Sequence, residues 1–428
     1  MDPEAIRRRE THRTTNGQFG HQPHTPPDMP NATPHWPSVT YEETPWARDP
    51  NLPLSRRQQR NQAGPYLAAV TPTIADRPLQ LPGAVQAAAS EAASELTRFD
   101  AELGQYTAPF AAMLLRTEST SSSQIEQLTA SAKQITLAQA GFERASINAK
   151  TIAANTNAMQ HAIAHTHGMP LSEQILETHR ILMQDDSWLH ATAGKWRTEQ
   201  VWIGGGSSPH TAVFVPPRHE RIPAAIADLE QFAKRTDIAP LEQVAIAHAQ
   251  FETIHPFPDG NGRTGRALAQ AMLRDSGITR HVTAPLSAGI LQQQDRYIEA
   301  LTAYRDGDPA PIVELFTDAT FTAVGRGRTL AEDTKALLEH WRQRVTARAD
   351  SASARGLETL IAHPAFTVTG FAQRLGVTYR AAANAIENYA AAGICTPASN
   401  NRRNRYWIAT EILTVLDDFA ATLLRPKP

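Results

Sequence analysis

The sequence predicts a mainly α-helical protein with a single β-hairpin near its middle and a separate helical module at its C-terminal end. Three observations carry this prediction. Apolar residues recur every three to four positions between about residues 80 and 330, which is typical of amphipathic helices. Two short runs rich in β-branched and aromatic residues flank a glycine-rich segment near residue 205. A new helical pattern, followed by two strand patterns, begins after residue 350.

Length and composition limit the classes of protein to consider. A chain of 428 residues is long enough for two or three domains. Its 41 Lys and Arg nearly balance its 43 Asp and Glu, which excludes a global polyanion-binding charge but not a local basic patch. The single cysteine, Cys395, excludes a disulfide framework and a multi-thiolate metal site. No membrane-spanning stretch or secretory signal is visible, so we expect a soluble, cytoplasmic protein.

The N-terminal segment 1–64 has the composition of a disordered arm. Its first 60 residues hold 10 of the chain's 30 prolines and almost no periodic apolar pattern. Such a segment cannot bury enough apolar surface to offset the entropy lost on ordering. We therefore expect residues 1–64 to be a proline-rich disordered arm, in which Trp36 and Trp46 are incidental aromatic residues.

Helical patterns account for most of the chain between residues 80 and 330. The expected amphipathic helices are 81–103, 110–115, 125–140, 147–165, 171–183, 222–232, 241–255, 263–275 and 292–304. Ser172 and Glu173 supply a cap and a first-turn acid at the start of the helix 171–183.

One segment in this helical region has a strand pattern instead. Residues 200–203 and 212–215 are short apolar runs around a glycine-rich tip, and two prolines follow them at 216–217. Short apolar runs joined by a glycine-rich tip predict a β-hairpin. A lone hairpin in a helical domain needs either a partner to pair with or a function of its own.

The C-terminal part has its own order of elements. Helical patterns cover residues 357–361, 368–377 and 379–392, and two short strands between 394 and 408 surround a basic tip. A glycine turn separates the second helix from the third. Helix-turn-helix followed by a hairpin is the winged-helix plan, so we expect a winged helix-turn-helix domain over residues 331–428.

The chemically dense segment is residues 255–266, which read HPFPDGNGRTGR. Helical patterns precede and follow it, so the segment is predicted to be a tight loop between two helices. Its glycines let backbone N–H groups approach a ligand closely, and the second helix offers its positive N-terminus. Arg263 and Arg266 share one face of that first turn, where two cations imply a bound anion. A phosphate chain fits, with Asp259 placed to hold a divalent cation between phosphate oxygens.

Two other phosphate-binding motifs share these glycines. Residues 260–265 match GxGxxG, but that dinucleotide-binding fingerprint follows a strand, whereas a helix precedes it here. A Walker A loop needs Lys and then Ser or Thr after Gly265, where this chain has Arg266 and Ala267. Both alternatives therefore fail.

Residues 255–266 match the signature HxFx[D/E]GNGRxxR of the Fic (filamentation induced by cAMP) family at every defined position. Two further segments resemble the same family. Residues 194–197, with the hairpin at 200–215, resemble its target-docking flap. Residues 118–126 resemble its N-terminal inhibitory helix, whose pattern is [S/T]xxxE[G/N].

The resemblance covers about residues 65–425 and implies an arrangement of domains. An N-terminal helical region at 65–165 would carry the inhibitory helix. An all-helical Fic catalytic core with its flap would occupy 166–330, followed by the winged helix at 331–428. The arm at 1–64 lies outside the resemblance.

The family's chemistry is transfer of AMP from ATP to a Ser, Thr or Tyr hydroxyl of a protein, with Mg²⁺. The resemblance implies that His255 is the general base for the hydroxyl proton and that Asp259 ligates Mg²⁺. Backbone N–H groups and the Asn261 side chain would form an anion hole, and two arginines would brace the β- and γ-phosphates. The implied phosphate-binding residues are Gly260, Asn261, Gly262, Arg263 and Arg266.

The other implied roles concern the target and the support of the loop. A flap edge can hold a target segment by main-chain hydrogen bonds. Phe257 is expected to pack the loop into the core, and His179 to be a packed core histidine. The implied docking residues of the flap are Val201, Trp202, Ile203, Gly204 and Gly205.

Glu126 is implied to be the inhibitory residue, with Ser122 at the first position of the inhibitory pattern. It would pair with Arg266 and keep that arginine from the γ-phosphate of ATP. A structural alternative exists, because Ser123 and Glu126 also match a helix N-terminal capping box. Gln127 stands where the family has Gly or Asn, which leaves the strength of inhibition open.

Two classes of function remain open at this point. The first is an autoinhibited protein adenylyltransferase that modifies a target protein or itself, with a second copy of the chain as a further partner and no membrane. The second is a nucleotide-sensing DNA-binding regulator that acts through the winged helix. A Fic transferase that uses another nucleotide is a chemical variant of the first class. The cations expected to meet DNA are Arg380, Arg402, Arg403 and Arg405.

Overall fold

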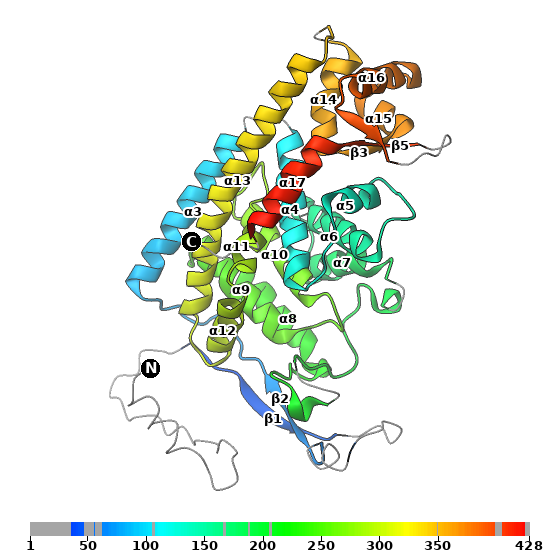
Figure 1. Ribbon diagram of the computed structural model, residues 1–428. Helices are drawn as coiled ribbons and strands as arrows, with labels where there is room; N and C mark the ends of the chain where they lie inside the picture. Colours follow the sequence, from blue (N-terminus) through cyan, green and yellow to red (C-terminus); the bar gives the residue numbers. More distant parts are fainter. Residues whose placement is uncertain are drawn as a thin grey trace, which may run out of the picture. The chain divides into compact units, whose positions relative to one another are not determined.

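Amphipathic helices form most of the described chain in this computed structural model, so the prediction of a mainly α fold is confirmed (Figure 1). The structure describes residues 36–46, 55, 62–104, 108–165, 168–186, 189–204, 208–348, 350–398 and 405–423. Within these ranges, every helix is too short or too polar to cross a membrane.

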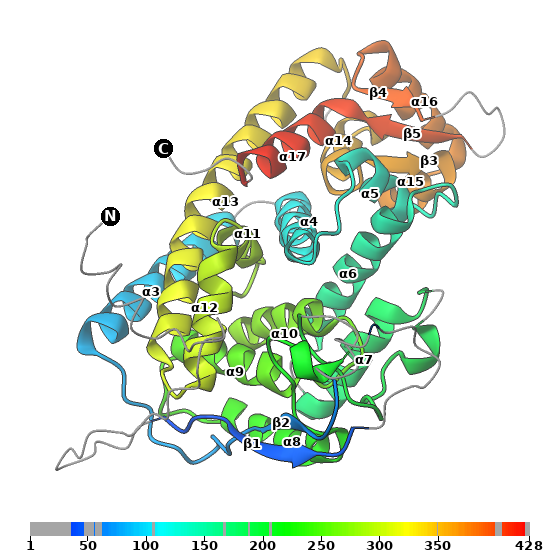
Figure 2. The same cartoon turned by 60° about the horizontal axis from the view of Figure 1, so that its bottom comes forward.

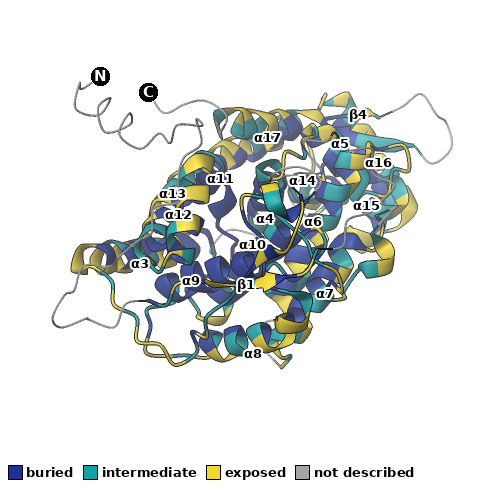
Figure 3. Cartoon of the chain, turned by 90° about the horizontal axis from the view of Figure 1, so that it is seen from below, coloured by how far each residue is buried: buried dark blue, intermediate teal, exposed yellow. Residues whose placement is uncertain are grey.

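The centre of the fold is a pair of buried helices, α9 (Pro240–Ile254) and α10 (Asn261–Asp275). Nearly all residues of both helices are buried, as their dark blue ribbons show in Figure 3. The two helices pack against each other, and α10 also packs against α6 (Ile147–Ala164). The long helix α13 (Ala310–Arg344) contacts α9 and runs along α3 (Gly83–Gly104). The loop that joins α9 to α10 lies instead against α7 (Leu171–Met183), whose Leu182 and Met183 side chains are close to Gly260.

Further helices complete this core. They are α4 (Ala108–Ile125), α5 (Ala132–Gln139), α7 (Leu171–Met183), α8 (Ile222–Ala233), α11 (Leu286–Leu291) and α12 (Gln294–Arg305). The helix α4 lies against α6 and α11, and it also contacts the C-terminal part of the chain (Figure 2).

The predicted helix at 125–140 is wrong as a single element. The helix α4 ends at Ile125, and α5 begins at Ala132. Gln127 breaks the helical path because its backbone is left-handed, with φ +61°. Ser131 then starts α5 as its N-cap, since its side chain accepts a hydrogen bond from the Gln134 N–H.

Part of the expected disordered arm is folded. Residues Thr40–Thr44 form the strand β1, which pairs antiparallel with β2 (Tyr66–Val70). Trp36 is buried, with its ring 6.3 Å from the rings of Phe232 and Tyr304. The prediction of disorder was therefore wrong for residues in this stretch, because their partners lie far along the chain. Most of the rest of the arm, 1–35, 47–54 and 56–61, lies outside the described residues.

Among the described residues of the predicted hairpin at 200–215, Ile203 and Phe214 form an isolated β-bridge. A 3-10 turn at Pro209–Thr211 precedes the second run. On the other side of this segment, the Ala69 N–H of β2 donates to the Val215 carbonyl oxygen at 3.0 Å. The segment therefore pairs with the N-terminal ribbon as well as with itself.

The C-terminal part contains the expected helices and strands in the expected order. The sheet order is β3-β5-β4, with both pairs antiparallel. Two elements, β3 and α17, were not expected, and the expected boundary at 330/331 falls inside the continuous helix α13. The assignment as a winged helix stays a prediction. The elements are α14 (Ala352–Ala362), β3 (Ala365–Thr367), α15 (Val368–Leu375), α16 (Tyr379–Ala391), β4 (Cys395–Pro397), β5 (Tyr406–Ala409) and α17 (Thr410–Leu423).

Candidate active site

The loop between α9 and α10 is shaped by two left-handed residues. His255 ends α9 with φ 49° and ψ 61°, and Gly260 precedes α10 with φ 79°. Glycine is required at 260 for its backbone and for space, because a Cβ there would lie 2.7 Å from the Met183 methyl carbon. The predicted tight loop between two helices is therefore present, with the start of α10 facing it.

The Asn261 side chain stabilises this loop by hydrogen bonds to its main chain. Its Oδ1 accepts from the Phe257 N–H, and its Nδ2 donates to the Phe257 carbonyl oxygen, both at 2.9 Å. The side chain is buried. These two bonds use Oδ1 and one of the two N–H groups of Nδ2, so the expected place of the Asn261 side chain in an anion hole stays a prediction. Its backbone N–H remains in the first turn of α10.

Phe257 and His179 support the loop by stacking on each other and by hydrogen bonds. Phe257 is fully buried and stacks on the His179 ring, with centroids 3.7 Å apart and planes 6° apart. His179 accepts at Nδ1 from the Gly194 N–H and donates from Nε2 to the Asp259 carbonyl oxygen. Burial lowers the pKa of His179 to about 4, so the neutral form required by these two bonds persists at pH 7. The expected core histidine is therefore also a link between the loop and residue 194.

The imidazole of His255 is neutral and has a free ring nitrogen. Burial, and then the positive charge of Arg197, lower the pKa of His255 to about 4. Among the described residues Nδ1 has no hydrogen-bond partner, although Glu252 Oε2 lies 3.9 Å away. Burial raises the pKa of Glu252 to about 7. A neutral imidazole at the rim of the loop can accept a proton, as expected for a general base.

Arg263 provides a buried guanidinium with two unpaired nitrogens at the start of α10. Its side chain is buried, and one guanidinium nitrogen, Nη2, lies 3.4 Å from Asp259 Oδ2. Nε and Nη1 find no partner within the part of the chain that the structure describes. The first N–H groups of a helix also lack intrahelical partners. Together these donors form a site for an anion at the N-terminus of α10.

Arg266 is buried one turn further along, and two of its guanidinium nitrogens donate to Ser122 in α4 and to Glu126 directly after it. Nε donates to Ser122 Oγ at 2.9 Å, and Nη2 donates to the Ser122 carbonyl oxygen at 2.7 Å. Nη2 also donates to Glu126 Oε1 at 2.7 Å. Burial opposes ionisation of Glu126, but the charge and hydrogen bond of Arg266 outweigh it and lower the pKa of the carboxyl group. The expected pairing of Glu126 with Arg266 is thus present.

The Glu126 carboxylate also lies over the first turn of α10. A Cβ at Gly262 would come within 2.1 Å of Glu126 Oε1. The acid therefore takes space at the helix N-terminus where an anion would bind. The capping-box alternative is wrong, because Ser123 and Glu126 lie at the C-terminal end of α4, and Ser123 Oγ donates back to the Ser119 carbonyl oxygen.

A second buried acid, Glu118, fixes α4 to the core and was missed from the sequence. Its Oε1 accepts from Gln270 Nε2 at 2.9 Å, and its two oxygens accept from the N–H and hydroxyl of Ser287. Glu118 meets Gln270 and Ser122 meets Arg266, so the two helices run antiparallel with polar contacts every four residues. Burial raises the pKa of Glu118 to about 7.

The left-handed Gln127 predicts a stabilising substitution. The Leu128 N–H donates to the Ser123 carbonyl oxygen and closes α4 around Gln127. A non-glycine residue in the left-handed conformation destabilises the folded state by about 1–2 kcal/mol. Glycine avoids this strain, but part of the gain is lost because glycine gives the unfolded chain more conformational entropy. We expect Gln127→Gly to raise the free energy of unfolding by about 0.5–1 kcal/mol in urea denaturation. Gln124→Gly, inside the helix, is the control and should lower it by about 1 kcal/mol. A loss of stability in Gln127→Gly would contradict the argument from strain.

Asp259 is the expected Mg²⁺ ligand. Its side chain is 56% exposed, and Oδ1 accepts from the Gly260 N–H at 2.6 Å. Over the described ranges no group of three or more His, Cys, Asp or Glu residues could hold a metal by itself. A single exposed carboxylate fits Mg²⁺, which is held by one or two carboxylates together with substrate phosphates.

The flap residues expected to hold a target lie beside the N-terminal ribbon. Val201, Trp202 and Ile203 are partly buried, and Gly204 is exposed. The Trp202 ring lies edge-on to Trp46, with centroids 5.8 Å apart. Gly205 lies outside the described residues. The segment from 201 to 204 thus leaves part of its surface open.

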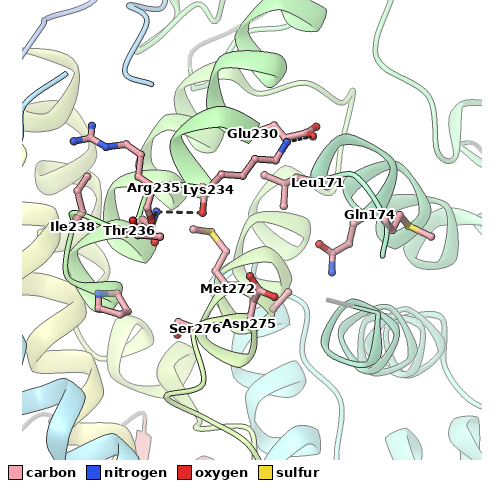
Figure 4. Close-up of a pocket in the computed structure, with 15 residues that line it drawn as sticks. Leu171, Gln174, Glu230, Lys234, Arg235, Thr236, Ile238, Met272, Asp275 and Ser276 are labelled. Atoms are coloured by element: carbon pink, nitrogen blue, oxygen red, sulfur yellow. Dashed lines mark hydrogen bonds and ion pairs between the residues drawn. The ribbon is translucent and has the colours of Figure 1, made fainter. Parts of the chain in front are cut away.

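The predicted site residues do not line the large hollow drawn in Figure 4. This hollow of about 480 Å³ lies among α7, α8 and the far end of α10, where Asp275 and Ser276 border it. Polar groups on its wall bind one another, for example Lys234 and Glu230 at 3.0 Å. These charged side chains therefore do not need a ligand to neutralise them.

Comparisons with known proteins agree with this geometry. Residues 170–273 match the model of the Fic/DOC family. "Protein adenylyltransferase Fic" of Drosophila erecta is 29% identical over 151 residues, which are 35% of this chain and 27% of that protein. The Drosophila melanogaster protein of the same name is 28% identical over 151 residues, with the same shares covered. The match thus spans about a quarter of the length of these relatives.

A solved structure shows the same fold over more of the chain. A Fic family protein from Desulfovibrio desulfuricans has 22% sequence identity and a TM-score of 0.52, and the match covers 78% of this chain and 98% of that one. The matched family segment contains the loop at 255–266 and the flap. Glu126 and the C-terminal module lie outside it. The signature, the family model and the fold together show that this chain carries a domain of the Fic/DOC family over residues 170–273.

Proposed function

We propose that this chain is a protein adenylyltransferase that moves AMP from ATP to a Ser, Thr or Tyr hydroxyl of a target protein. One observation carries the proposal: Arg263 is buried with two unpaired donors in the same loop as the neutral imidazole of His255. The two free donors of this buried cation can bind an anion, and a neutral imidazole can accept a proton. The fly relatives named protein adenylyltransferase Fic support the same chemistry.

In this reaction the target hydroxyl oxygen attacks the α-phosphorus of ATP, and His255 accepts the hydroxyl proton at a ring nitrogen. The bond between the α-phosphorus and the bridging oxygen of the β-phosphate breaks, and pyrophosphate leaves with that oxygen. The N–H groups at the start of α10 and Arg263 would hold the phosphate oxygens as charge develops on them. Asp259 would hold Mg²⁺, which would supply further neutralisation of the phosphate charge.

We propose that the contact between Glu126 and Arg266 is inhibitory. In the present arrangement Ser122 and Glu126 occupy the Arg266 donors that would otherwise bind the γ-phosphate. The Glu126 carboxylate also carries negative charge to the first turn of α10, where it competes with phosphate. ATP would then bind without its γ-phosphate braced, which favours an unproductive position of the α-phosphorus.

The proposed partner is a target protein whose extended segment docks on the flap at 201–204. DNA binding and self-association stay predictions. Of the cations expected to contact DNA, Arg380 is exposed on α16, and Arg405 lies 5.6 Å from the Trp407 ring centre. Arg402 and Arg403 lie outside the described residues.

The test compares wild type with Glu126→Gly, using Mg²⁺, a lysate of the source organism, and ATP labelled at either the α- or the γ-phosphate. We expect the α-label to enter protein and the γ-label to stay in solution. Glu126→Gly should raise transfer by about 5- to 150-fold, the usual range for removal of a coupled inhibitory contact. Gln124→Gly, which also weakens the end of α4 but keeps Glu126, is the matched control and should stay close to wild type.

Two outcomes would contradict the proposal. Transfer of the γ-label would show phosphorylation in place of AMP transfer. An absence of both labels, with tight binding of ATP, would exclude ATP as the donor. Other labelled nucleotides, and then DNA fragments, would follow in that case.

A further inference from the structure

Arg197 lies where the loop at 255–260 meets both ends of the flap. Its side chain is buried, and its guanidinium donates to three backbone carbonyl oxygens. Nε donates to the carbonyl oxygen of His255 at 2.9 Å. Nη1 donates to the carbonyl oxygen of Glu199 at 2.9 Å, and Nη2 donates to that of Pro217. The Arg197 side chain therefore links His255 to Glu199 and Pro217, the residues that flank the flap.

The main chain of Arg197 strengthens the same contact. Its N–H donates to the Pro256 carbonyl oxygen at 2.9 Å, so Arg197 binds two successive peptide groups of the loop. His255 is left-handed at φ 49°, a conformation that a non-glycine residue keeps only when its surroundings hold it. The two hydrogen bonds to residues 255 and 256 are therefore well placed to hold the imidazole in its orientation.

The flap ends are tied to each other as well as to the loop. Gln200 Nε2 donates to the Val201 carbonyl oxygen at 3.0 Å and to the Pro216 carbonyl oxygen at 2.8 Å. The flap is thus closed at its base, and Arg197 connects that base to His255. Burial lowers the pKa of Arg197 only to about 10, so the guanidinium remains charged at neutral pH.

We propose that Arg197 is a positioning residue for AMP transfer, which fixes the His255 imidazole relative to a hydroxyl presented on the flap. This inference rests on the proposed function. None of the hydrogen bonds that Arg197 makes within the described chain reaches Arg263 or Arg266. Loss of Arg197 should therefore lower the rate of transfer and leave the affinity for nucleotide unchanged.

The experiment uses full-length Glu126→Gly as the parent, with Arg197→Ala and Arg197→Lys added to it. Arg218→Ala is the matched control, because the Arg218 side chain follows the flap but is 40% exposed and pairs with the nearby Glu220. We would measure kcat and KM of transfer, and the Kd of a non-hydrolysable ATP analogue by calorimetry. We expect Arg197→Ala to lower kcat by about 100-fold, as misplacement by an ångström can do, with an unchanged Kd. The kcat of Arg197→Lys should lie between those of Arg197→Ala and the parent. The kcat of Arg218→Ala should match that of the parent.

Added guanidinium distinguishes a positioning role from a purely structural one, because only a positioning role predicts recovery of kcat. At millimolar concentration it can enter the space left in Arg197→Ala, and we expect it to restore part of the lost kcat. It should have no such effect in Arg197→Lys or in the parent. Failure of this rescue, a kcat of Arg197→Ala close to that of the parent, or a parallel loss of nucleotide binding would each overturn the proposal.

Hydrogen exchange tests the same link without any transfer reaction. In Arg197→Ala the amides of 200–216 and of 255–260 should exchange faster together, while those of α10 and α13 keep their protection. Faster exchange in only one of the two segments would overturn the proposed link. A parent that transfers nothing would count against the proposed function alone, since the exchange result would still decide the role of Arg197.

Discussion

Replacing His255 with alanine in the Glu126→Gly parent should lower kcat for AMP transfer by about 10²–10⁴-fold, the usual contribution of a general base. The imidazole is the proposed proton acceptor, and burial lowers its pKa to about 4, which keeps it neutral at pH 7. Nucleotide binding should persist, because the proposed phosphate-binding groups, Arg263 and the first turn of α10, do not include the imidazole. Steady-state transfer and calorimetry with an ATP analogue would separate the two effects.

The pH dependence of the same parent gives a second view of His255. The base works only unprotonated, and with a pKa of about 4 it is unprotonated through the neutral range. The value of kcat/KM for ATP should therefore stay level down to about pH 5 and fall as the pH approaches 4. An ordinary histidine would make it fall below about pH 6.5. A fall at that higher pH would contradict the electrostatic account of the site.

His248→Ala is a suitable control for the loss of a buried imidazole near the site. His248 is buried in α9 and bonds the Tyr297 hydroxyl at 2.9 Å. Its removal should lower stability and leave the proton acceptor in place. If His248→Ala and His255→Ala lowered kcat equally at a temperature where both are folded, the role of His255 as a base would be contradicted.

The sequence predicted the parts of the molecule that depend on local signals. The helix at Leu171–Met183 has the predicted bounds, because its apolar stripe begins directly after Pro170 and ends where the pattern ends. The loop at 255–260 follows from its glycines and from the helical patterns on both sides. Such features need only neighbouring residues, so a single sequence contains the information.

Contacts that close over long stretches of chain could not be predicted in the same way. Glu118 meets Ser287 across 169 positions, and His179 meets Asp259 across 80. Arg197 and His255 are separated by 58 positions. Nothing near any of these residues indicates its partner, although a buried Glu in a helix without a local cation is a signal to look for one.

Two of the differences between the predicted and the observed fold have different origins. The apolar spacing at 125–140 passes over Gln127, whose left-handed backbone is stabilised by the hydrogen bond that closes α4. Residues 40–44 lack a periodic apolar pattern, and their strand forms because β2 pairs with it. At 125–140 a local cap ends the helix, whereas at 40–44 pairing with a distant strand outweighs local preference.

Phe257→Ala should lower the free energy of unfolding by about 3–5 kcal/mol, the cost of removing a large aromatic side chain from a close-packed core. The ring is fully buried and stacks on His179 and on Trp196, with centroids 3.7 and 5.1 Å apart. Chemical denaturation would measure the change. Phe321→Ala is the matched control, because Phe321 is 38% exposed on α13, and it should cost less than about 1 kcal/mol.

Substitution of Phe257 should also disturb the loop of the candidate active site, which an ordinary substitution in the core would not do. Its N–H and carbonyl group bind Asn261, and its ring supports the His179 that holds the Asp259 carbonyl oxygen. Phe257→Leu should retain much of the stability, since it keeps most of the apolar volume, but it lacks the flat face that His179 stacks on. We therefore expect Phe257→Leu to weaken binding of an ATP analogue while the protein stays folded. Unchanged binding would show that Asn261 alone maintains the loop.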